Sequence, residues 1–410
     1  MRRTLLAVVL SCGGLPPAVQ AQETGRPCLT SESAPAPNAP VVVPIHLRNN
    51  HVTFQVCRRD TALLFVLDTG AGSSILDLEK ARALGVQLGA PIRVRGAGAG
   101  SVGGARVPAD TVVLPGTGLN IPIPLAIDFS ALRAASGNRM DGILGGDFIT
   151  RYVLALDYRQ GEMRLYDRES FKYEGKGTVV PITILNNFIR ARGELVLDDG
   201  ARIPGEFTVD VGSSLALSLA KPFVETNRLR ERISPSIRRP GGRGVGGSPM
   251  ADVGRIAAFD LGGAEVNKPV VYMFGDSAGV FSSAAQGDGN IGGEILRRFT
   301  VYFDYKGQRM ILEPHDWTSE PFETDMSGMQ LRAMGDTASL IVEHVVAASP
   351  AGEAGLQKDD IVVAVDGVPA TKASLDEVRR RSRRLDERFT LTIRRAGSEM
   401  VIRFRTRRLL

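Results

Sequence analysis

The chain has 410 residues, more than one ordinary domain holds, so two or three domains are expected. Apolar residues make up 43% of the chain, enough for sizeable cores, and 46 glycines beside 6% aromatic residues favour a turn-rich, mainly β protein. The net charge of +5 is mild, and the arginine clusters near the C-terminus lack the aromatic context of a nucleic-acid-binding surface, so no nucleic-acid partner is expected.

Residues 1–21 have the pattern of a secretory signal peptide. Two arginines precede a short apolar run, and Ala21 ends a small-residue cleavage site. We therefore expect an exported protein, periplasmic in a bacterium; a lipoprotein with its lipid on Cys12 ranks second, because Leu10 is atypical in that signal. Residues 22–39, rich in Ser, Pro and Ala, predict a disordered leader. No later stretch is apolar over the length that a bilayer requires, so no integral membrane span is expected.

Two cysteines, Cys28 and Cys57, remain after removal of the signal, and an oxidising compartment would allow one disulfide between them. The chain has no two cysteines separated by two residues, the spacing common in zinc sites. It has only four scattered histidines, which are expected to be structural. We therefore predict no zinc site or other metal site.

The first chemical motif follows an apolar strand. Residues 63–67 run directly into Asp68-Thr69-Gly70. A carboxylate at the end of a buried strand costs on the order of several kcal/mol unless a partner pairs with it or shares its proton. Alone, the tripeptide is more typical of a turn than of a site, so its meaning depends on whether the chain supplies a second carboxylate.

An internal repeat supplies that carboxylate. The four residues at 42–45 recur at 179–182, and Asp210, within the apolar strand and turn at 207–215, falls opposite Asp68. Farther on, residues 141–148 match 289–295, and residues 155–158 match 302–305. Four landmarks in the same order make chance a poor explanation. The repeat predicts two tandem β lobes, residues 40–172 and 173–318.

Each lobe is predicted to consist of short strands with few helices. The expected strands include 52–56, 63–67, 153–156 and 300–303, and the expected helices are 78–84 and 222–232. A glycine-rich hairpin lies between the matched motifs of each lobe. Either could be a plain flexible loop, but their matching placement favours flaps over a cleft, formed by Gly98, Ala99, Gly100, Gly244, Val245 and Gly246.

Residues 319–410 predict a third unit, small and of α+β type. A strand at 340–342 and a short helix with a turn at 348–356 are followed by a strand at 361–367. An amphipathic helix at 374–385 then precedes two closing strands, 389–394 and 400–404.

Over about residues 40–315, the lobes resemble retropepsin-like and pepsin-like aspartic proteases, in the paired aspartate motifs and in the segments 143–145 and 290–292 downstream. The resemblance implies two pseudo-symmetric lobes that form one cleft, a peptide or protein substrate, and no cofactor. Since one chain supplies both lobes, a monomer suffices. The site residues that it implies are the catalytic pair Asp68 and Asp210 and the supporting residues Thr69, Gly70, Gly212 and Ser213.

The chain departs from these families at two points and shows one asymmetry between its motifs. Val211 stands where a second threonine would supply a hydroxyl to the other lobe, and the flaps lack the tyrosine usual in pepsins. The third residue after the aspartate is Ala71 in the first motif but Ser213 in the second. We hypothesise that Ser213 bonds Asp210 and keeps it ionised, which leaves Asp68 to carry the proton.

The third unit resembles a bacterial PDZ domain of the type attached to exported proteases. The resemblance rests on Ser349-Pro350-Ala351, Ala354-Gly355-Leu356, Asp360-Ile361-Val362 and Val365-Asp366-Gly367, while Asp359 replaces the usual glycine. It implies a bound peptide terminus as partner. The peptide-binding loop would be formed by Gly328, Met329, Gln330 and Leu331.

These features predict an exported aspartic endopeptidase whose PDZ domain recruits a substrate or partner. Val211 motivates the alternative of an inactive peptide-binding scaffold with the same fold. The arginine-rich C-terminal unit motivates a third possibility, an adaptor that binds a membrane or a partner.

Overall fold

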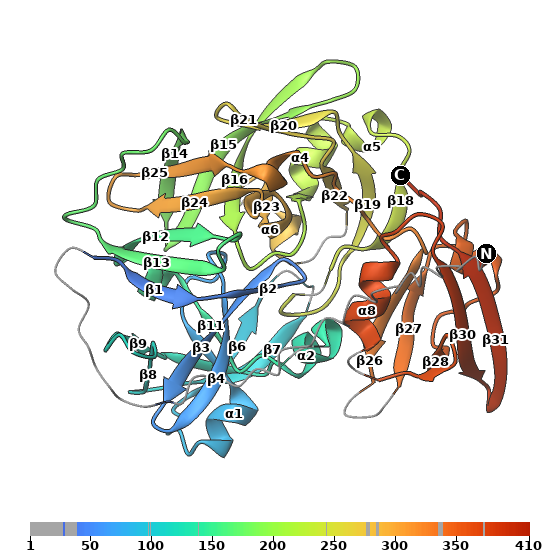
Figure 1. Cartoon of the computed structure of the whole chain (residues 1–410), viewed down its shortest axis with the longest axis horizontal. Helices are drawn as coiled ribbons and strands as arrows, with labels where there is room; N and C mark the ends of the chain where they lie inside the picture. The colour runs from blue at the N-terminus through green and yellow to red at the C-terminus, as the bar shows by residue number, and fades with distance from the viewer. Residues whose placement is uncertain are drawn as a thin grey trace, which may run out of the picture.

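The computed structural model describes Cys28 and residues 39–410, apart from residues 97, 99, 138, 243, 276–278, 284–286, 335–338 and 372–373. The predicted signal peptide, most of the predicted leader and the flap residue Ala99 lie outside this part. The described residues are mainly β, which confirms the predicted fold class (Figure 1). None of their helices is both long and apolar enough to cross a membrane.

The first lobe is a set of short strands with three short helices interspersed (Figure 1). Its elements are β1 (Val41–Pro44), β2 (His46–Arg48), β3 (His51–Arg58), β4 (Thr61–Leu67), β5 (Ile75–Asp77), α1 (Leu78–Ala83), β6 (Pro91–Arg95), β7 (Ser101–Arg106), β8 (Thr111–Val113), β9 (Asn120–Pro122), β10 (Leu125–Ile127), α2 (Ser130–Ser136), β11 (Gly142–Leu144), α3 (Gly146–Ile149), β12 (Tyr152–Asp157) and β13 (Glu162–Asp167).

The second lobe repeats this plan. Its elements are β14 (Thr178–Leu185), β15 (Phe188–Val196), β16 (Arg202–Asp210), β17 (Leu217–Leu219), α4 (Lys221–Thr226), α5 (Leu229–Arg232), β18 (Ile237–Pro240), β19 (Met250–Arg255), β20 (Ala258–Leu261), β21 (Ala264–Asn267), β22 (Val270–Phe274), the 3-10 helix η1 (Val280–Ser282), β23 (Gly289–Gly292), α6 (Gly293–Leu296), β24 (Phe299–Asp304), β25 (Arg309–Pro314) and the 3-10 helix η3 (Asp316–Ser319).

The strand that precedes each aspartate is central in its lobe. β4 pairs in parallel with β11, Val66 opposite Ile143, and β16 pairs in parallel with β23, Val209 opposite Ile291. A strand covered on both faces is apolar at successive positions rather than at alternate ones, as residues 63–67 are. The two matched pairings make the lobes pseudo-symmetric.

The lobes are joined by a continuous sheet and a continuous core. β12 of the first lobe pairs antiparallel with β24 of the second, Leu154 opposite Phe303, so β1, β12 and β13 belong to the 15-stranded sheet of the second lobe. Buried apolar side chains of both lobes form one cluster, which Leu154 and Phe303 share. The position of one aspartate relative to the other is therefore set by packed structure and not by a flexible linker.

The third unit has its own sheet and its own core. The sheet order is β26-β27-β28-β30-β31, which leaves β26 at one edge, and the buried residues form a separate cluster. Its elements are β26 (Met329–Ala333), β27 (Leu340–Val345), α7 (Pro350–Glu353), β28 (Ile361–Val365), β29 (Val368–Pro369), α8 (Ser374–Arg381), β30 (Arg388–Arg395) and β31 (Ser398–Arg405).

One predicted helix divides in two, another ends earlier than expected, and the helix α2 was not predicted. The segment 222–232 divides into α4 and α5, because Arg228 adopts the left-handed conformation with φ of 51°. The amphipathic helix ends at Arg381 instead of continuing to Leu385. The additional helix, α2, has no buried residue within its span.

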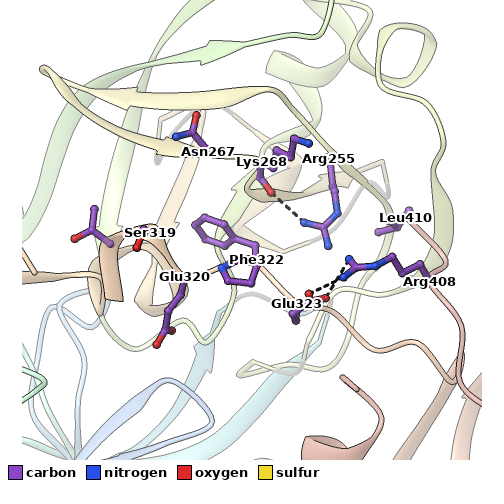
Figure 2. A pocket seen from close by; sticks show the side chains of 11 residues that line it. Arg255, Asn267, Lys268, Ser319, Glu320, Phe322, Glu323, Arg408 and Leu410 are labelled. Carbon is purple, nitrogen blue, oxygen red and sulfur yellow. Dashed lines mark hydrogen bonds and ion pairs between the residues drawn. The ribbon is translucent and has the colours of Figure 1, made fainter. Parts of the chain in front are cut away.

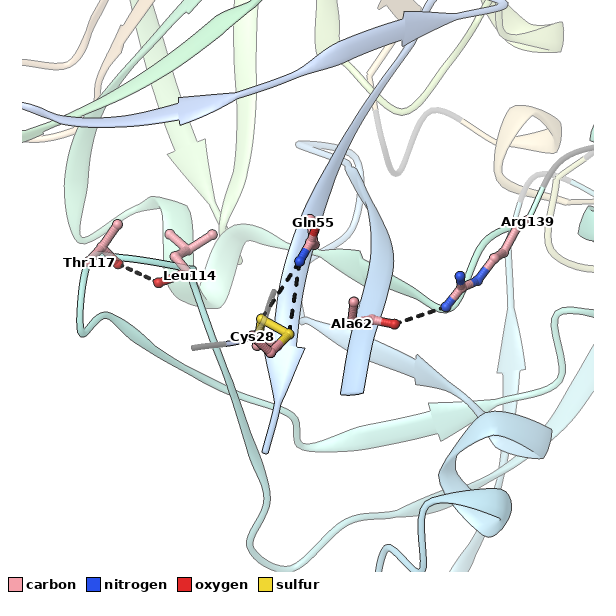
Figure 3. Close-up of a disulfide and its surroundings, with 7 residues drawn as sticks. Cys28, Gln55, Ala62, Leu114, Thr117 and Arg139 are labelled. Atoms are coloured by element: carbon pink, nitrogen blue, oxygen red, sulfur yellow. Dashed lines mark hydrogen bonds between the residues drawn. A yellow bond between two sulfur atoms is a disulfide. The ribbon is translucent and has the colours of Figure 1, made fainter. Parts of the chain in front are cut away.

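A disulfide joins Cys28 to Cys57, as the cysteine count allowed (Figure 3). It ties the segment before β1 to the end of β3. The Gln55 side-chain amide lies 3.9 Å from both sulfur atoms. The disulfide lies within the first lobe and does not connect it to the second.

Candidate active site

The structure brings Asp68 and Asp210 together at the junction of the lobes. Asp68 follows β4, Asp210 ends β16, and the two carboxyl groups lie close enough for the charge of Asp210 to act on Asp68. The glycine of each motif lies against the opposite aspartate. A Cβ added to Gly212 would lie 2.3 Å from Cγ of Asp68, and one added to Gly70 would lie 2.6 Å from Oδ1 of Asp210. Each motif therefore needs its glycine to let the other carboxyl group approach.

Burial raises the pKa of the Asp68 carboxyl group, and the negative charge of Asp210 raises it further. Burial also raises the pKa of Asp210, but hydrogen bonds from Asn290 and Ser213 oppose that effect. Neighbouring carboxyl groups of this kind share a proton, because the second ionisation would place two negative charges side by side. The difference in hydrogen bonding favours the proton on Asp68.

Asn290 is the site residue whose side-chain role the sequence did not reveal. Its amide Nδ2 donates to Oδ2 of Asp210 over 2.7 Å. Asn290 lies in the segment 290–292, which contributed to the family resemblance without an assigned side-chain role. A polar residue in the middle of a buried β segment was the available signal, since the matching position of the first lobe is Ile143.

Ser213 bonds Asp210 as hypothesised, but through its backbone N–H and not through its hydroxyl. The backbone N–H of Ser213 donates to Oδ1 of Asp210 over 3.0 Å, while the Ser213 hydroxyl oxygen accepts from the N–H of Leu215 over 3.4 Å. The hydroxyl is drawn into the turn that follows the aspartate. The donor to the other carboxyl oxygen is the Asn290 amide.

Thr69 connects the lobes behind the two aspartates. Its buried hydroxyl donates to the backbone oxygen of Val209 over 2.7 Å and accepts from the N–H of Val211 over 2.9 Å. Val211, with no hydroxyl, is itself fully buried among apolar residues. The link between the lobes is therefore one-sided, and Thr69 makes both of its bonds to the opposite strand.

A pair of hairpin turns provides a second, reciprocal link. Asn50 Nδ2 donates to the Ser214 oxygen over 3.0 Å, and Asn187 Nδ2 donates to the Gly72 oxygen over 3.2 Å. Both asparagines have positive φ, a conformation that asparagine tolerates better than most residues. Each lobe thus uses an Asn-Asn turn to hold the loop that carries the other lobe's aspartate.

The two predicted flaps touch one another. Gly98 N–H donates to the Val245 oxygen over 2.9 Å, and Gly100 N–H donates to the Gly246 oxygen over 2.8 Å. Val245 also packs against an apolar cluster on which Ala71, three residues after Asp68, packs as well. Gly244 pairs with Gly247 in the same loop. The flaps are therefore closed on each other beside the Asp68 loop.

The predicted peptide-binding loop of the third unit leads into its edge strand. Gly328 has φ of 80°, and Met329 and Leu331 are buried on the inner face of β26. Oδ1 of Asp325 accepts the N–H of Gly328 over 2.6 Å. The Gln330 side-chain oxygen is buried without a hydrogen-bond partner. This loop is not part of the aspartate site.

A pocket elsewhere on the protein is separate from the aspartate site. A pocket of about 410 Å³ lies among Arg255, Phe322 and Arg408, and it contains none of the predicted site residues (Figure 2). Two of its cations are engaged, since Arg408 pairs with Glu323 and Arg255 donates to the Lys268 oxygen. Within the described residues, no three side chains of His, Cys, Asp or Glu cluster as metal ligands would.

Comparison with protein families agrees with this architecture. Residues 52–148 match an aspartyl protease family model, and residues 341–395 match a PDZ domain model. The chain therefore carries an aspartyl protease domain and a C-terminal PDZ domain, which confirms the predicted resemblance and supports a protease-type function. Asp68 lies within the matched residues and Asp210 lies beyond them. A comparison with curated proteins found no match.

Proposed function

We propose that the chain is an aspartic endopeptidase with Asp68 and Asp210 as its catalytic pair. The observation that carries this proposal is the close approach of two carboxyl groups from different lobes, beside flaps that hydrogen-bond to each other. Such a pair can hold one proton and present a base and an acid to the same water and carbonyl.

In the proposed reaction, ionised Asp210 takes a proton from a water as the water oxygen attacks the scissile carbonyl carbon. Asp68 gives its proton to the carbonyl oxygen. The resulting tetrahedral species collapses with cleavage of the C–N bond, and the leaving nitrogen receives the proton from Asp210. Asp68 recovers its proton from the hydroxyl group. Asn290 holds Asp210 in its ionised form, and the flaps exclude bulk water.

We further propose that the protein acts outside the cytoplasm as a monomer. The Cys28–Cys57 disulfide supports an oxidising compartment, and the N-terminal sequence supports export through a signal peptide. The PDZ domain is proposed to bind the terminus of a peptide substrate or partner by adding it as a strand.

Cleavage of unstructured peptides between pH 4 and 7 tests the proposal. Asp68→Asn and Asp210→Asn are each expected to abolish cleavage, whereas Asp198→Asn, at an exposed position outside the site, is expected to leave it unchanged. A wild-type protein that binds such peptides without cleaving them would instead support the inactive scaffold that Val211 suggests.

A further inference from the structure

The strand and helix that border the peptide-binding face of the PDZ domain lie against the first lobe. β26 is the edge strand of its sheet, follows the loop at Gly328 and lies beside α8. A peptide that extends this sheet at the edge next to the Gly328 loop and α8 lies along β26. In the structure α2 of the protease lobe lies against β26, next to α8 (Figure 1).

The contact is specific in its hydrogen bonds. Arg379 of α8 donates to the Ala135 oxygen over 2.5 Å and to the Ser136 oxygen over 2.9 Å, at the C-terminal end of α2. The same guanidinium lies 3.4 Å from the backbone oxygen of Leu331 in β26. One arginine of the PDZ domain thus binds both the last carbonyl groups of α2 and the edge strand.

Two further contacts surround this arginine. Gly137, just after α2, lies so near Leu375 of α8 that an added Cβ would be 3.6 Å from the Leu375 Cβ. Asn49 Nδ2, in the hairpin turn of the first lobe, donates to Oδ1 of Asp376 over 3.0 Å. The face of the PDZ domain between β26 and α8 is therefore covered by the protease lobe.

We propose that α2 occupies the peptide-binding face of the PDZ domain, so that a peptide binding there must displace α2. The partner that fits is an extended peptide with a free C-terminal carboxylate, because residues 341–395 match a PDZ domain model and such domains take up a peptide as an added strand. The inference rests on the proposed function for its consequence, which is that peptide capture releases the flaps.

The route from this contact to the site runs through packed residues. Leu132 of α2 packs on the same apolar cluster as Val245 of the flap and Ala71 of the Asp68 loop. On the other side, burial lowers the pKa of His51, the nearby Arg379 charge lowers it further, and the backbone of Gly212 opposes this shift. β27 of the PDZ domain also lies against β18, which leads into the second flap. Displacement of α2 would therefore loosen both flap and aspartate loops.

Hydrogen exchange of the full chain tests the contact without relying on catalysis. Arg379→Ala is expected to speed amide exchange in α2 and in residues 244–247 on the order of fivefold or more, the usual range of coupling between sites. The Arg379→Ala variant is also expected to bind a fluorescein-labelled decapeptide that ends in Leu-Val with a free carboxylate, and to bind it more tightly than wild type does. The same decapeptide with an amidated C-terminus is expected to bind weakly. Arg380→Ala, on the exposed face of the same helix, is the matched control.

A disulfide between α2 and α8 tests the opposite case, in which α2 cannot leave the PDZ domain. The double variant Gly137→Cys with Leu375→Cys places two Cβ atoms within the range of a disulfide. The oxidised variant is expected to lose peptide binding and to cleave at least tenfold more slowly than the Leu375→Cys single variant under the same conditions. Reductant should restore both properties, with reduced wild type as the control for the native disulfide.

Equal exchange and equal peptide affinity in Arg379→Ala and Arg380→Ala would overturn the inference, as would a locked form that still binds the peptide. If no form cleaves any substrate, the proposed endopeptidase function fails, while exchange and peptide binding still decide whether α2 covers the PDZ face.

Discussion

The side-chain amide of Asn290 donates to Oδ2 of Asp210, and the matching position in the first lobe is the apolar Ile143. Two loops that otherwise mirror each other thus give their aspartates different surroundings. Asp210 has an additional neutral donor that stabilises its charge, while burial and the Asp210 charge hold the proton on Asp68. In the proposed mechanism, this asymmetry makes Asp210 the base and Asp68 the acid.

Asn290→Ala is expected to shift the acid limb of the pH–rate profile to higher pH. The amide lowers the pKa of Asp210, so its loss raises that pKa and reduces the ionised fraction at a given pH. Because a hydrogen bond to a charged group contributes about 1.5–3 kcal/mol, the rate should fall roughly 10- to 100-fold near the limb. Asn290→Ser, which keeps a donor, should recover part of the loss. An unshifted limb in the alanine variant would contradict the assigned role.

Asp68→Asn is expected to stabilise the folded protein at neutral and alkaline pH. The folded-state pKa of Asp68 is raised, so its favourable contribution is complete below the ordinary aspartate pKa of about 4 and is lost as pH rises through the raised value. Asparagine carries no proton to lose. The melting temperature of the variant should therefore exceed that of wild type by at least about 2 °C at pH 8, with a difference that narrows toward pH 4. A difference that does not depend on pH, or one that Asp198→Asn reproduces, would refute this account.

Thr69→Val is expected to destabilise the junction of the lobes. The substitution keeps the size of the side chain but leaves the Val209 oxygen and the Val211 N–H without their partner, at about 1–3 kcal/mol for each buried group. Urea unfolding measures the loss. Thr69→Ser retains the hydroxyl and should lie closer to wild type. Equal midpoints for Val and Ser would show that the hydroxyl does not stabilise the junction.

Gly98→Ala is expected to prevent the flaps from closing. A Cβ at this position would lie 2.1 Å from the backbone carbonyl carbon of Gly246. Relief of this clash requires a shift of the backbone in one of the two flaps. Cleavage should fall at least about tenfold, because closure over the substrate is what excludes water. The unfolding midpoint should change little. Gly103→Ala, in the same hairpin but facing open space, is the matched control; equal activity of the two variants would rule out a need for flap contact.

The aspartates, the duplicated lobes and the PDZ unit could be predicted because their signals are local and recur. Residues 63–67 are apolar at successive positions because β4 is covered on both faces, and the three residues before Asp210 are likewise buried. Glycine follows each aspartate at the point where a Cβ would meet the opposite carboxyl group. Such constraints act on each position separately, so they remain visible in one sequence.

The helix α2 could not be predicted in the same way. It is seven residues long, has no side-chain cap and buries none of its residues, and so short a helix is marginal without tertiary contacts. Its end is held by Arg379, which lies more than two hundred positions away in the chain. The sequence carries no local trace of such a contact.

The sequence by itself determined that two aspartates, each at the end of a buried strand, would be paired by a repeated lobe. Only the tertiary structure decided which groups touch them. It showed that Asn290 rather than the Ser213 hydroxyl reaches Asp210, that Thr69 bonds to the residues before and after Asp210, and that the PDZ domain faces α2. The physical reason is that strand periodicity and glycine placement are set by neighbouring residues. The direction of a side chain depends on the register between distant strands and on how separately folded units pack.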